Sequence, residues 1–229
     1  MSIKDNLRII EENIHKALVK SGRENDKVEI IAVTKTVDVD RIQEALSLGL
    51  RNIGENRPQE LVRKYDIIGK GPNYHMIGHL QTNKVKYIID KVSLIHSLDR
   101  ISLAEELDKR AKMHNLIINT LIQVNVAEED SKFGLKVEEV MPFIESILKY
   151  NNIKIKGLMT IAPFSENPEE VRWVFKTLRQ LRDSIVREKF DNVEMGILSM
   201  GMTNDYTIAV EEGANMVRIG TGLFGKRNY

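Results

Sequence analysis

The chain has 229 residues, of which 42% are hydrophobic and 29% charged, so it can bury a sizeable core and has the composition of an ordinary globular protein. Lys and Arg number 34 against 33 Asp and Glu, a balance that gives no global field to attract nucleic acid or an anionic membrane. The absence of Cys excludes disulfides, thiolate zinc sites and cysteine nucleophiles. No apolar run reaches the ~20 residues that span a bilayer. Charges at Lys4 and Asp5 stand where a signal peptide has its apolar core, so we expect a cytoplasmic protein.

The chain opens with an amphipathic helical pattern, because apolar residues recur every three or four positions from Ile3 to Leu18. A short apolar run at 29–34 then predicts a strand buried on both faces. Asp38 or Asp40 is the expected cap of the helix that follows, and Gly49 is its expected end.

The same strand-and-helix unit then repeats along the chain. A clear later helix is predicted over 171–185, begun by a capping Asn167 with Pro168 at the first helical position and Glu170 at the third. Another helical pattern runs over 137–148. The remaining strands are predicted at 51–54, 74–78, 94–97, 118–126, 155–161, 195–200 and 216–220.

Strand–helix alternation implies parallel strands joined by helices. Eight such units in 229 residues predict a compact (β/α)8 barrel, which we expect to form one domain over residues 1–229 with an extra N-terminal helix. A doubly wound open sheet also alternates, but it usually carries a glycine-rich turn after its first strand. Here the first strand runs into Thr34-Lys35-Thr36, which has no glycine, so the barrel is preferred.

Polar side chains follow the predicted strands at the end where barrels of this kind carry their chemistry. Lys35 comes directly after the first strand, and an amine at that position can attack a carbonyl and form a Schiff base. A rim lysine that extends its ammonium group to water would occupy the same place. Position alone leaves both interpretations open.

The last strand runs into Gly220-Thr221-Gly222, where the backbone can approach an anion closely. Ser199 and the loop to Thr203 add hydroxyls after the seventh strand, and the loops after strands seven and eight are a frequent phosphate site of this fold. These residues predict phosphate binding, and the alternative is that the glycines only make tight turns.

Four further polar residues are less decisive. Arg218 lies inside the last strand, so it contacts either a ligand at the barrel mouth or an internal partner such as a glutamate. His75 and His79 are four residues apart but lie across a strand and its exit, and His96 stands alone. We therefore predict no metal site.

Short motifs that run in order across nearly the whole chain match one known family. They are IAVTKT at 31–36, GEN at 54–56, HMIGHLQTNK at 75–84, QVN at 123–125, SKFG at 131–134, GLMTIAP at 157–163, LSMGM at 198–202 and VRIGT at 217–221. With these motifs the chain resembles the pyridoxal phosphate homeostasis protein family, the single-domain relatives of the alanine racemase barrel. Tyr74 stands where Trp is expected, and Thr203-Asn204-Asp205 where Ser, a polar residue and Asp are usual.

The resemblance implies an alanine racemase N-terminal-domain-like barrel that holds pyridoxal 5′-phosphate (PLP) at its mouth. It implies that Lys35 forms a Schiff base with PLP and that Arg218 faces the pyridine nitrogen, with Asn56 close to the ring. By the same resemblance, the phosphate-binding positions are Ser199, Gly220 and Thr221. An Arg does not readily give up a proton, so the ring would be a weaker electron sink than one paired with Asp.

The expected function is therefore that of a PLP-binding protein of vitamin B6 homeostasis without established turnover. The alternative is a PLP-dependent amino-acid racemase of weak or narrow activity. A two-base racemase of the alanine racemase kind needs a further domain, which we do not expect in a chain that ends at Tyr229. A third possibility is a barrel that acts on a sugar phosphate through a lysine without cofactor, and Lys35 on the first strand argues against it. We expect a monomer with PLP-dependent apoenzymes as candidate partners, and neither a nucleic-acid nor a membrane partner.

Overall fold

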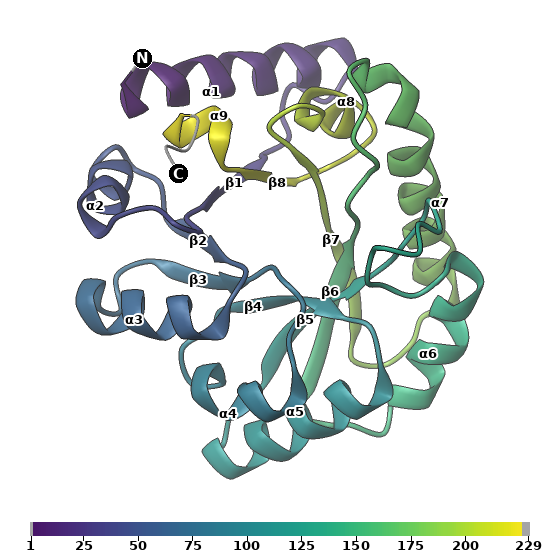
Figure 1. Cartoon of the computed structure of the whole chain (residues 1–229). Helices are drawn as coiled ribbons and strands as arrows, with labels where there is room; N and C mark the ends of the chain where they lie inside the picture. The colour runs from purple at the N-terminus through teal and green to yellow at the C-terminus, as the bar shows by residue number, and fades with distance from the viewer. Residues whose placement is uncertain (1, 226–229) are drawn as a thin grey trace.

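The predicted strands pair side by side into a closed parallel barrel in the order β1 to β8 within residues 2–225, which are the residues that the computed structural model describes (Figure 1). The barrel closes where Ile31 of the first strand lies in register with Arg218 of the last. This confirms the predicted (β/α)8 barrel, and every predicted strand end lies within three residues of the observed one. The strands are β1 (Glu29–Val33), β2 (Asn52–Glu55), β3 (Asn73–Met76), β4 (Leu94–Leu98), β5 (Ile118–Gln123), β6 (Ile153–Met159), β7 (Val193–Met202) and β8 (Met216–Ile219).

Helices surround the barrel and connect successive strands (Figure 1). Among the described helices, none is long and apolar enough to cross a membrane. The helices are α1 (Ile3–Lys20), α2 (Val39–Ser47), α3 (Pro58–Ile68), α4 (Val85–Ile88), α5 (Ile101–His114), α6 (Val140–Ile147), α7 (Arg172–Glu188), α8 (Tyr206–Glu211) and α9 (Thr221–Phe224).

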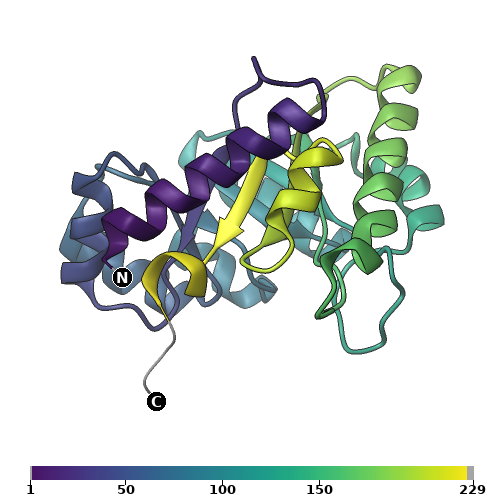
Figure 2. The same ribbon diagram turned by 90° about the horizontal axis from the view of Figure 1, so that it is seen from above.

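The predicted N-terminal helix is present as α1, which begins with a capping box between Ser2 and Asp5. It lies across α8 and α9, as two views at right angles show (Figures 1 and 2). Its Asn6 Nδ2 donates a 2.9 Å hydrogen bond to the Leu223 carbonyl oxygen. The helix therefore supports the segments on both sides of β8, where the phosphate site is predicted.

The predicted helix over 171–185 begins differently from the expectation. Its first turn, Pro168–Val171, is a 3₁₀ turn, and α7 starts at Arg172. Asn167 caps this turn by accepting a hydrogen bond from the Glu169 N–H. The Glu170 carboxylate accepts a hydrogen bond from the Ser165 hydroxyl instead of returning to the cap, which is why the full capping box does not form.

The barrel wall separates two apolar clusters, because alternate residues of a strand face opposite sides. Ile30 and Ala32 of β1 pack outward against the helices. Ile31 faces inward and belongs to a cluster that fills the barrel interior. The other buried members of that inner cluster are Leu94, Leu121, Met159 and Met216. Polar residues that point inward, including Arg218 at 3% exposure, share the barrel interior with this inner apolar cluster. These polar residues form the deeper part of the candidate site.

Candidate functional site

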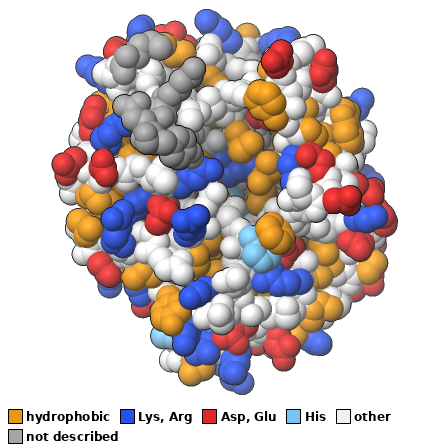
Figure 3. Space-filling view, viewed as in Figure 1, with side chains coloured by type: hydrophobic (Ala, Val, Ile, Leu, Met, Phe, Trp, Pro, Cys, Tyr) orange, Lys and Arg blue, Asp and Glu red, His pale blue; other side chains and the backbone are white. Residues whose placement is uncertain are grey.

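A cavity of ≈ 390 Å³ lies at the carboxyl ends of β1, β6, β7 and β8. Since the strands are parallel, their carboxyl ends meet at one face, and residues far apart in the sequence line one hollow. Lys and Arg side chains gather around the centre of this face, beside a histidine (Figure 3). The polar side chains that line the cavity are those of Lys35, Lys132, Ser165, Thr203, Asn204, Asp205, Arg218 and Thr221.

Lys35 follows β1 by two residues and is half-buried in the cavity wall. Within the described part of the chain its ammonium group has no hydrogen-bonded or ion-paired acceptor. The backbone around it is tightly held, because the Thr34 N–H donates to the Gly54 carbonyl at 3.0 Å. The next residue, Thr36, has a φ of 61°, a left-handed conformation that a β-branched residue rarely adopts. Among the described residues, Lys35 thus combines an amine that has no acceptor with a backbone that is fixed and, at Thr36, strained.

A buried group of ion-paired residues, which we call the Lys64 cluster (Lys64, Glu55, Glu60 and Thr34), holds the backbone beside Lys35 from outside the barrel wall. Lys64 Nζ lies 2.5 Å from Glu55 Oε1, and both side chains are fully buried. Lys64 also donates to the Thr34 carbonyl oxygen at 2.6 Å, and the Thr34 hydroxyl donates to Glu55 Oε1 at 2.5 Å. The Thr36 N–H donates to Glu60 Oε2 at 3.1 Å. The residues on both sides of Lys35 are therefore fixed to α3 and β2.

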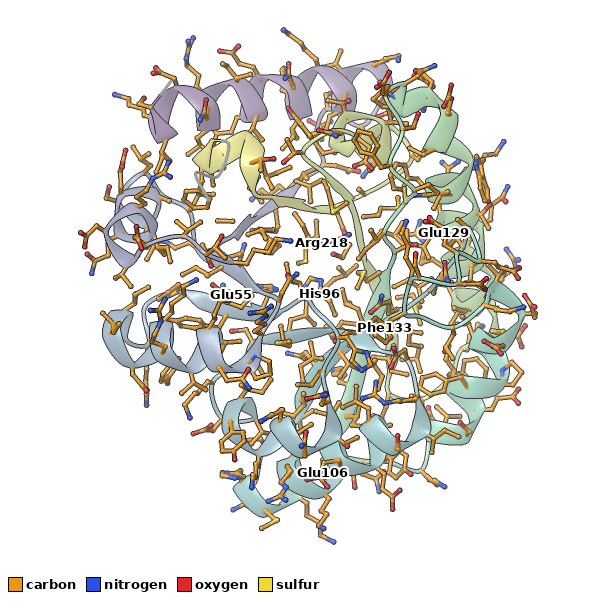
Figure 4. The ribbon with its side chains drawn as sticks, viewed as in Figure 1. Glu55, His96, Glu106, Glu129, Phe133 and Arg218 are labelled. Carbon is orange, nitrogen blue, oxygen red and sulfur yellow. The ribbon has the colours of Figure 1, made fainter. Side chains whose placement is uncertain are left out.

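Glu55 is a fully buried carboxylate on β2, facing α3 (Figure 4). Burial raises its pKa, while the charge of Lys64 and the hydrogen bonds from Lys64 and Thr34 oppose that rise. Its second oxygen, Oε2, is buried and has no hydrogen-bond partner among the described residues. The carboxylate consequently depends on Lys64 for compensation.

Arg218 points from β8 into the barrel, toward the same interior as His96 (Figure 4). Its Nη1 donates to Ser199 Oγ and its Nη2 to the Thr160 carbonyl oxygen, both at 2.7 Å. Burial lowers the pKa of Arg218 to about 10, and the charge of Asp205 opposes that shift, so the guanidinium remains charged at neutral pH. Among the described residues Arg218 forms no ion pair with a carboxylate, so the internal glutamate considered from the sequence is not its direct partner.

A line of hydrogen bonds, which we call the histidine chain (Ser199, His96, His75, Asn52 and Glu29), continues inward from this point. Ser199 Oγ lies 3.0 Å from His96 Nδ1, and His96 Nε2 lies 3.0 Å from His75 Nδ1. His75 Nε2 lies 3.3 Å from Asn52 Oδ1, and Asn52 Nδ2 donates to Glu29 Oε2 at 2.8 Å. Burial lowers the pKa of His75 to about 4 and that of His96 well below its ordinary value, so both rings are neutral at pH 7.

The loops after β7 and β8 meet at a group that we call the hydroxyl cradle (Thr203, Gly220, Thr221 and Gly222). The Gly222 N–H donates to Thr203 Oγ1 at 3.1 Å, and the Thr221 and Thr203 hydroxyls lie 3.3 Å apart. A Cβ at position 222 would come within 3.0 Å of Thr203 Cγ2, so glycine lets the two loops approach this closely. The cradle presents two hydroxyls beside a glycine backbone on the cavity wall, a set of groups that suits an anion.

The structure brings together four of the six residues named from the sequence: Lys35, Arg218, Gly220 and Thr221 line the same cavity. Ser199 lies deeper, fully buried, with its hydroxyl bonded to Arg218 and His96. Asn56 lines a neighbouring hollow of ≈ 590 Å³ instead. Its backbone passes so close to Gly78 that a Cβ there would be 2.4 Å from the Asn56 carbonyl oxygen.

Sequence reasoning named Thr203 as the end of a hydroxyl-bearing loop, but it did not find the Lys64 cluster or the hydrogen bonds of the histidine chain. Lys64 lies one helical turn after the buried Leu61, and a lysine on an apolar stripe was the available signal. The pairing of His75 with His96 joins neighbouring strands 21 residues apart, which no local pattern reports. Within residues 2–225 no group of three or more His, Cys, Asp and Glu side chains is arranged to hold a metal ion.

Comparisons with known proteins agree with this architecture. The family model for the alanine racemase N-terminal domain matches residues 6–228. The pyridoxal phosphate homeostasis protein of Aquifex aeolicus (strain VF5) is 46% identical over 230 residues and covers all of both chains. The crystal structure of a protein from Bifidobacterium adolescentis has 33% identity and a TM-score of 0.89, covering 97% of this chain and 94% of that one. PipY of Synechococcus elongatus PCC7942, solved with PLP bound, has 30% identity and a TM-score of 0.79, covering 93% of this chain and 100% of that one.

The closed barrel with its lysine after β1 and the matched family model define a protein of the alanine racemase N-terminal-domain class. Sequence identity over the full length of the relatives narrows this class to one family. The chain belongs to the pyridoxal phosphate homeostasis protein family, as its motifs predicted.

Proposed function

We propose that this chain binds PLP in the cavity above β1, β7 and β8 and serves PLP homeostasis, holding the cofactor on Lys35 as a Schiff base without turnover. One observation carries the proposal: Lys35, which has no hydrogen-bonded or ion-paired acceptor among the described residues, lines a single cavity of ≈ 390 Å³ with the buried Arg218 and with Thr203, Gly220 and Thr221 of the hydroxyl cradle. The name of the Aquifex aeolicus relative and the PLP in the PipY structure support the choice of cofactor.

The donor set fits PLP chemically. When bound, PLP supplies an electrophilic aldehyde on an electron-withdrawing ring that also carries a phosphate group. Lys35 offers an amine, which is the partner of an aldehyde. Thr203, Thr221 and the backbone at Gly220 offer hydrogen bonds to an anion, and the close approach at Gly222 holds these groups together.

Each residue has a distinct proposed role. Lys35 is the covalent anchor, and Gly220 and Thr221 bind the phosphate together with Thr203. Arg218 donates to the ring nitrogen. Ser199, named from the resemblance as a phosphate ligand, has its hydroxyl on Arg218, and this supports a role in holding that guanidinium.

Two features support holding rather than turnover. Arg218 donates a hydrogen bond but does not give up its proton, so it leaves the ring nitrogen unprotonated, and such a ring withdraws electrons less strongly. Among the described residues that line the cavity there is no Tyr or His to act as an acid–base group opposite Lys35. Asn56 lines the neighbouring hollow, from which we propose that it reaches the ring edge, and as an amide it does not move protons at neutral pH.

We further propose that the protein is a cytoplasmic monomer of one domain over residues 1–229, of which residue 1 and residues 226–229 lie outside the described part. Its proposed partners are PLP-dependent apoenzymes that receive the cofactor. Light scattering of the loaded protein tests the monomer. Activation of a PLP-free aminotransferase by the loaded protein, compared with activation by an equal amount of free PLP, tests delivery.

The central test is the absorbance spectrum of the protein purified with PLP, before and after borohydride reduction, with the labelled peptide mapped. We expect a reducible band that maps to Lys35 and is absent in Lys35→Ala, whose unfolding transition stays unchanged because a half-buried lysine contributes little packing. Lys86→Ala, at an exposed lysine of α4, is the matched control and keeps the band. A band that persists in Lys35→Ala and maps to Lys132, the other lysine of the cavity, would overturn the assignment of the anchor.

A further inference from the structure

Arg218 is a buried cation that no carboxylate contacts directly, yet hydrogen bonds lead from it to one. The histidine chain begins at Ser199, which accepts from Arg218, and ends at Glu29, an exposed carboxylate at the first position of β1. The chain therefore crosses the barrel from the cavity to the opposite face.

The positions of the protons along this chain follow from its last member. An ionised Glu29 only accepts hydrogen bonds, so the Asn52 amide nitrogen faces it and the Asn52 oxygen faces His75. Asn73 Nδ2 also donates to that oxygen, at 3.0 Å, which agrees with this orientation. Because Asn52 Oδ1 only accepts, His75 carries its proton on Nε2.

The same logic continues toward the cavity. With the proton of a neutral His75 on Nε2, its Nδ1 accepts, so His96 donates from Nε2 and accepts at Nδ1. The Ser199 hydroxyl then donates to His96 Nδ1 and leaves an oxygen lone pair for the Arg218 Nη1 proton. Every donor thus points away from Arg218 and toward Glu29.

We propose that His96 and His75 are positioning residues, which fix the direction of the Ser199 hydroxyl and thereby the orientation of Arg218 at the cavity. The proposal rests on the proposed function for its ligand, since Arg218 is the residue that faces the ring. If the chain ran in the other direction, the Ser199 proton would point at a guanidinium N–H and repel it. As built, Ser199 and the Thr160 carbonyl fix two of the five guanidinium N–H groups and leave the others for the cavity.

The first test needs no cofactor. Long-range ¹H–¹⁵N correlation spectra of the full, unloaded chain report the protonation state of each of the five histidines, assigned by single substitutions. We expect His75 and His96 to be neutral and protonated at Nε2 at pH 7. A proton on Nδ1 of either ring, or an imidazolium, would overturn the proposed direction.

The second test measures PLP retention in variants of one position. His96→Leu removes the acceptor of the Ser199 proton, whereas His96→Asn places an oxygen where Nδ1 stood, because both atoms are two bonds from Cβ. We expect His96→Leu and Ser199→Ala to raise the PLP dissociation constant by about tenfold. We expect His96→Asn to restore most of that loss, although it cannot reach His75.

The matched control is Ser97→Ala, a buried hydroxyl on the same strand with no hydrogen-bond partner among the described residues. Equal weakening by Asn and Leu at position 96, or retention in Ser199→Ala equal to that of Ser97→Ala, would overturn the positioning role. The borohydride band on Lys35 in the unaltered protein separates this outcome from failure of the proposed function. If His96→Leu does not fold, Ser199→Ala and the spectra still decide the question.

Discussion

Two buried cations stand on either side of the barrel wall, and the protein compensates them in opposite ways. Lys64 lies between β2 and α3 with carboxylates of Glu55 and Glu60 at 2.5 and 3.5 Å. Arg218 lies inside the barrel and is held by a hydroxyl and a carbonyl. The first cation contacts carboxylates directly, whereas the second contacts only a hydroxyl and a carbonyl, and the charge of Asp205 acts on it without a hydrogen bond.

The difference matches what each cation does. The Lys64 cluster fixes the backbone on both sides of Lys35, and a strong ion pair suits that task because only position matters. Arg218 instead presents its own N–H groups to the cavity, and a carboxylate bound to it would compete with a ligand for those groups. Neutral partners hold the guanidinium and leave its charge available.

The largest expected effect on stability comes from removing the charge of Lys64. Lys64→Met leaves the buried Glu55 carboxylate without compensation, and we expect a loss of about 3–5 kcal/mol in the free energy of unfolding. Urea denaturation measures it. The double variant Lys64→Met, Glu55→Leu, which removes both charges, is expected to recover most of the loss. A single variant within about 1 kcal/mol of the unaltered protein would contradict the role given to this pair.

A series of unfolding measurements at different pH values tests the neutral histidines that support Arg218. The folded-state pKa of His75 is lowered to about 4 by burial and that of His96 is also lowered, so the unfolded chain binds protons that the folded chain does not. Their contribution to stability is therefore present above about pH 6.5, their ordinary value, and is lost as pH falls toward 4. Each ring adds a slope of about 1.4 kcal/mol per pH unit, so we expect a loss of about 2–3 kcal/mol between pH 6 and 5. His75→Asn should lower the slope by about half. A slope unchanged by that substitution would show that other groups carry the pH dependence.

Removing one hydroxyl of the cradle has a smaller expected effect, which we measure on PLP binding. Thr203→Val and Thr221→Val each delete one hydrogen bond to an anionic group, and we expect about 1.5 kcal/mol, or roughly tenfold in the PLP dissociation constant. Equilibrium dialysis with phosphate-free pyridoxal as the comparison ligand measures it. If both variants weaken pyridoxal as much as PLP, the hydroxyls do not act on the phosphate.

The smallest effect is expected at Thr36, whose φ of 61° places a β-branched residue in the left-handed region. Thr36→Gly removes a conformational cost of about 1–2 kcal/mol, which the greater freedom of glycine in the unfolded chain offsets by about 0.5–1 kcal/mol. We expect a gain of roughly 0.5–1 kcal/mol in the free energy of unfolding by urea. A loss of stability would mean that the Thr36 side chain has a stabilising contact that outweighs the strain.

The fold was predictable because most strands contain a short apolar run that alternates with a helical pattern, and the barrel buries both faces of such a strand. Lys35 and the Gly220-Thr221 turn were predictable because they directly follow those runs. The structure places Ser199 below the cavity, not on its wall, because it points inward from β7 while Thr203, four residues on, has left the strand. A rule that looks only at strand ends cannot separate a hydroxyl inside the last turns of a strand from one in the loop that follows.

The rest depended on side chains that meet only after the barrel closes. Glu55 and Lys64 are nine residues apart on different elements, and their contact needs the packing of α3 on β2. Ser199 and His96 are 103 residues apart. A single sequence does not report such pairs, and each residue alone resembles an ordinary polar residue near a strand end.

The histidine chain also bears on how barrels of this kind can be redesigned. Their amino-terminal face is usually treated as a supporting base and their carboxyl face as an exchangeable set of functional loops. Here Glu29 and Asn52 open β1 and β2 at the base, and they are joined to the arginine at the mouth by successive hydrogen bonds. A design that replaced one face of this barrel and kept the other would break these hydrogen bonds. The residues of both faces that form the histidine chain should therefore be kept together.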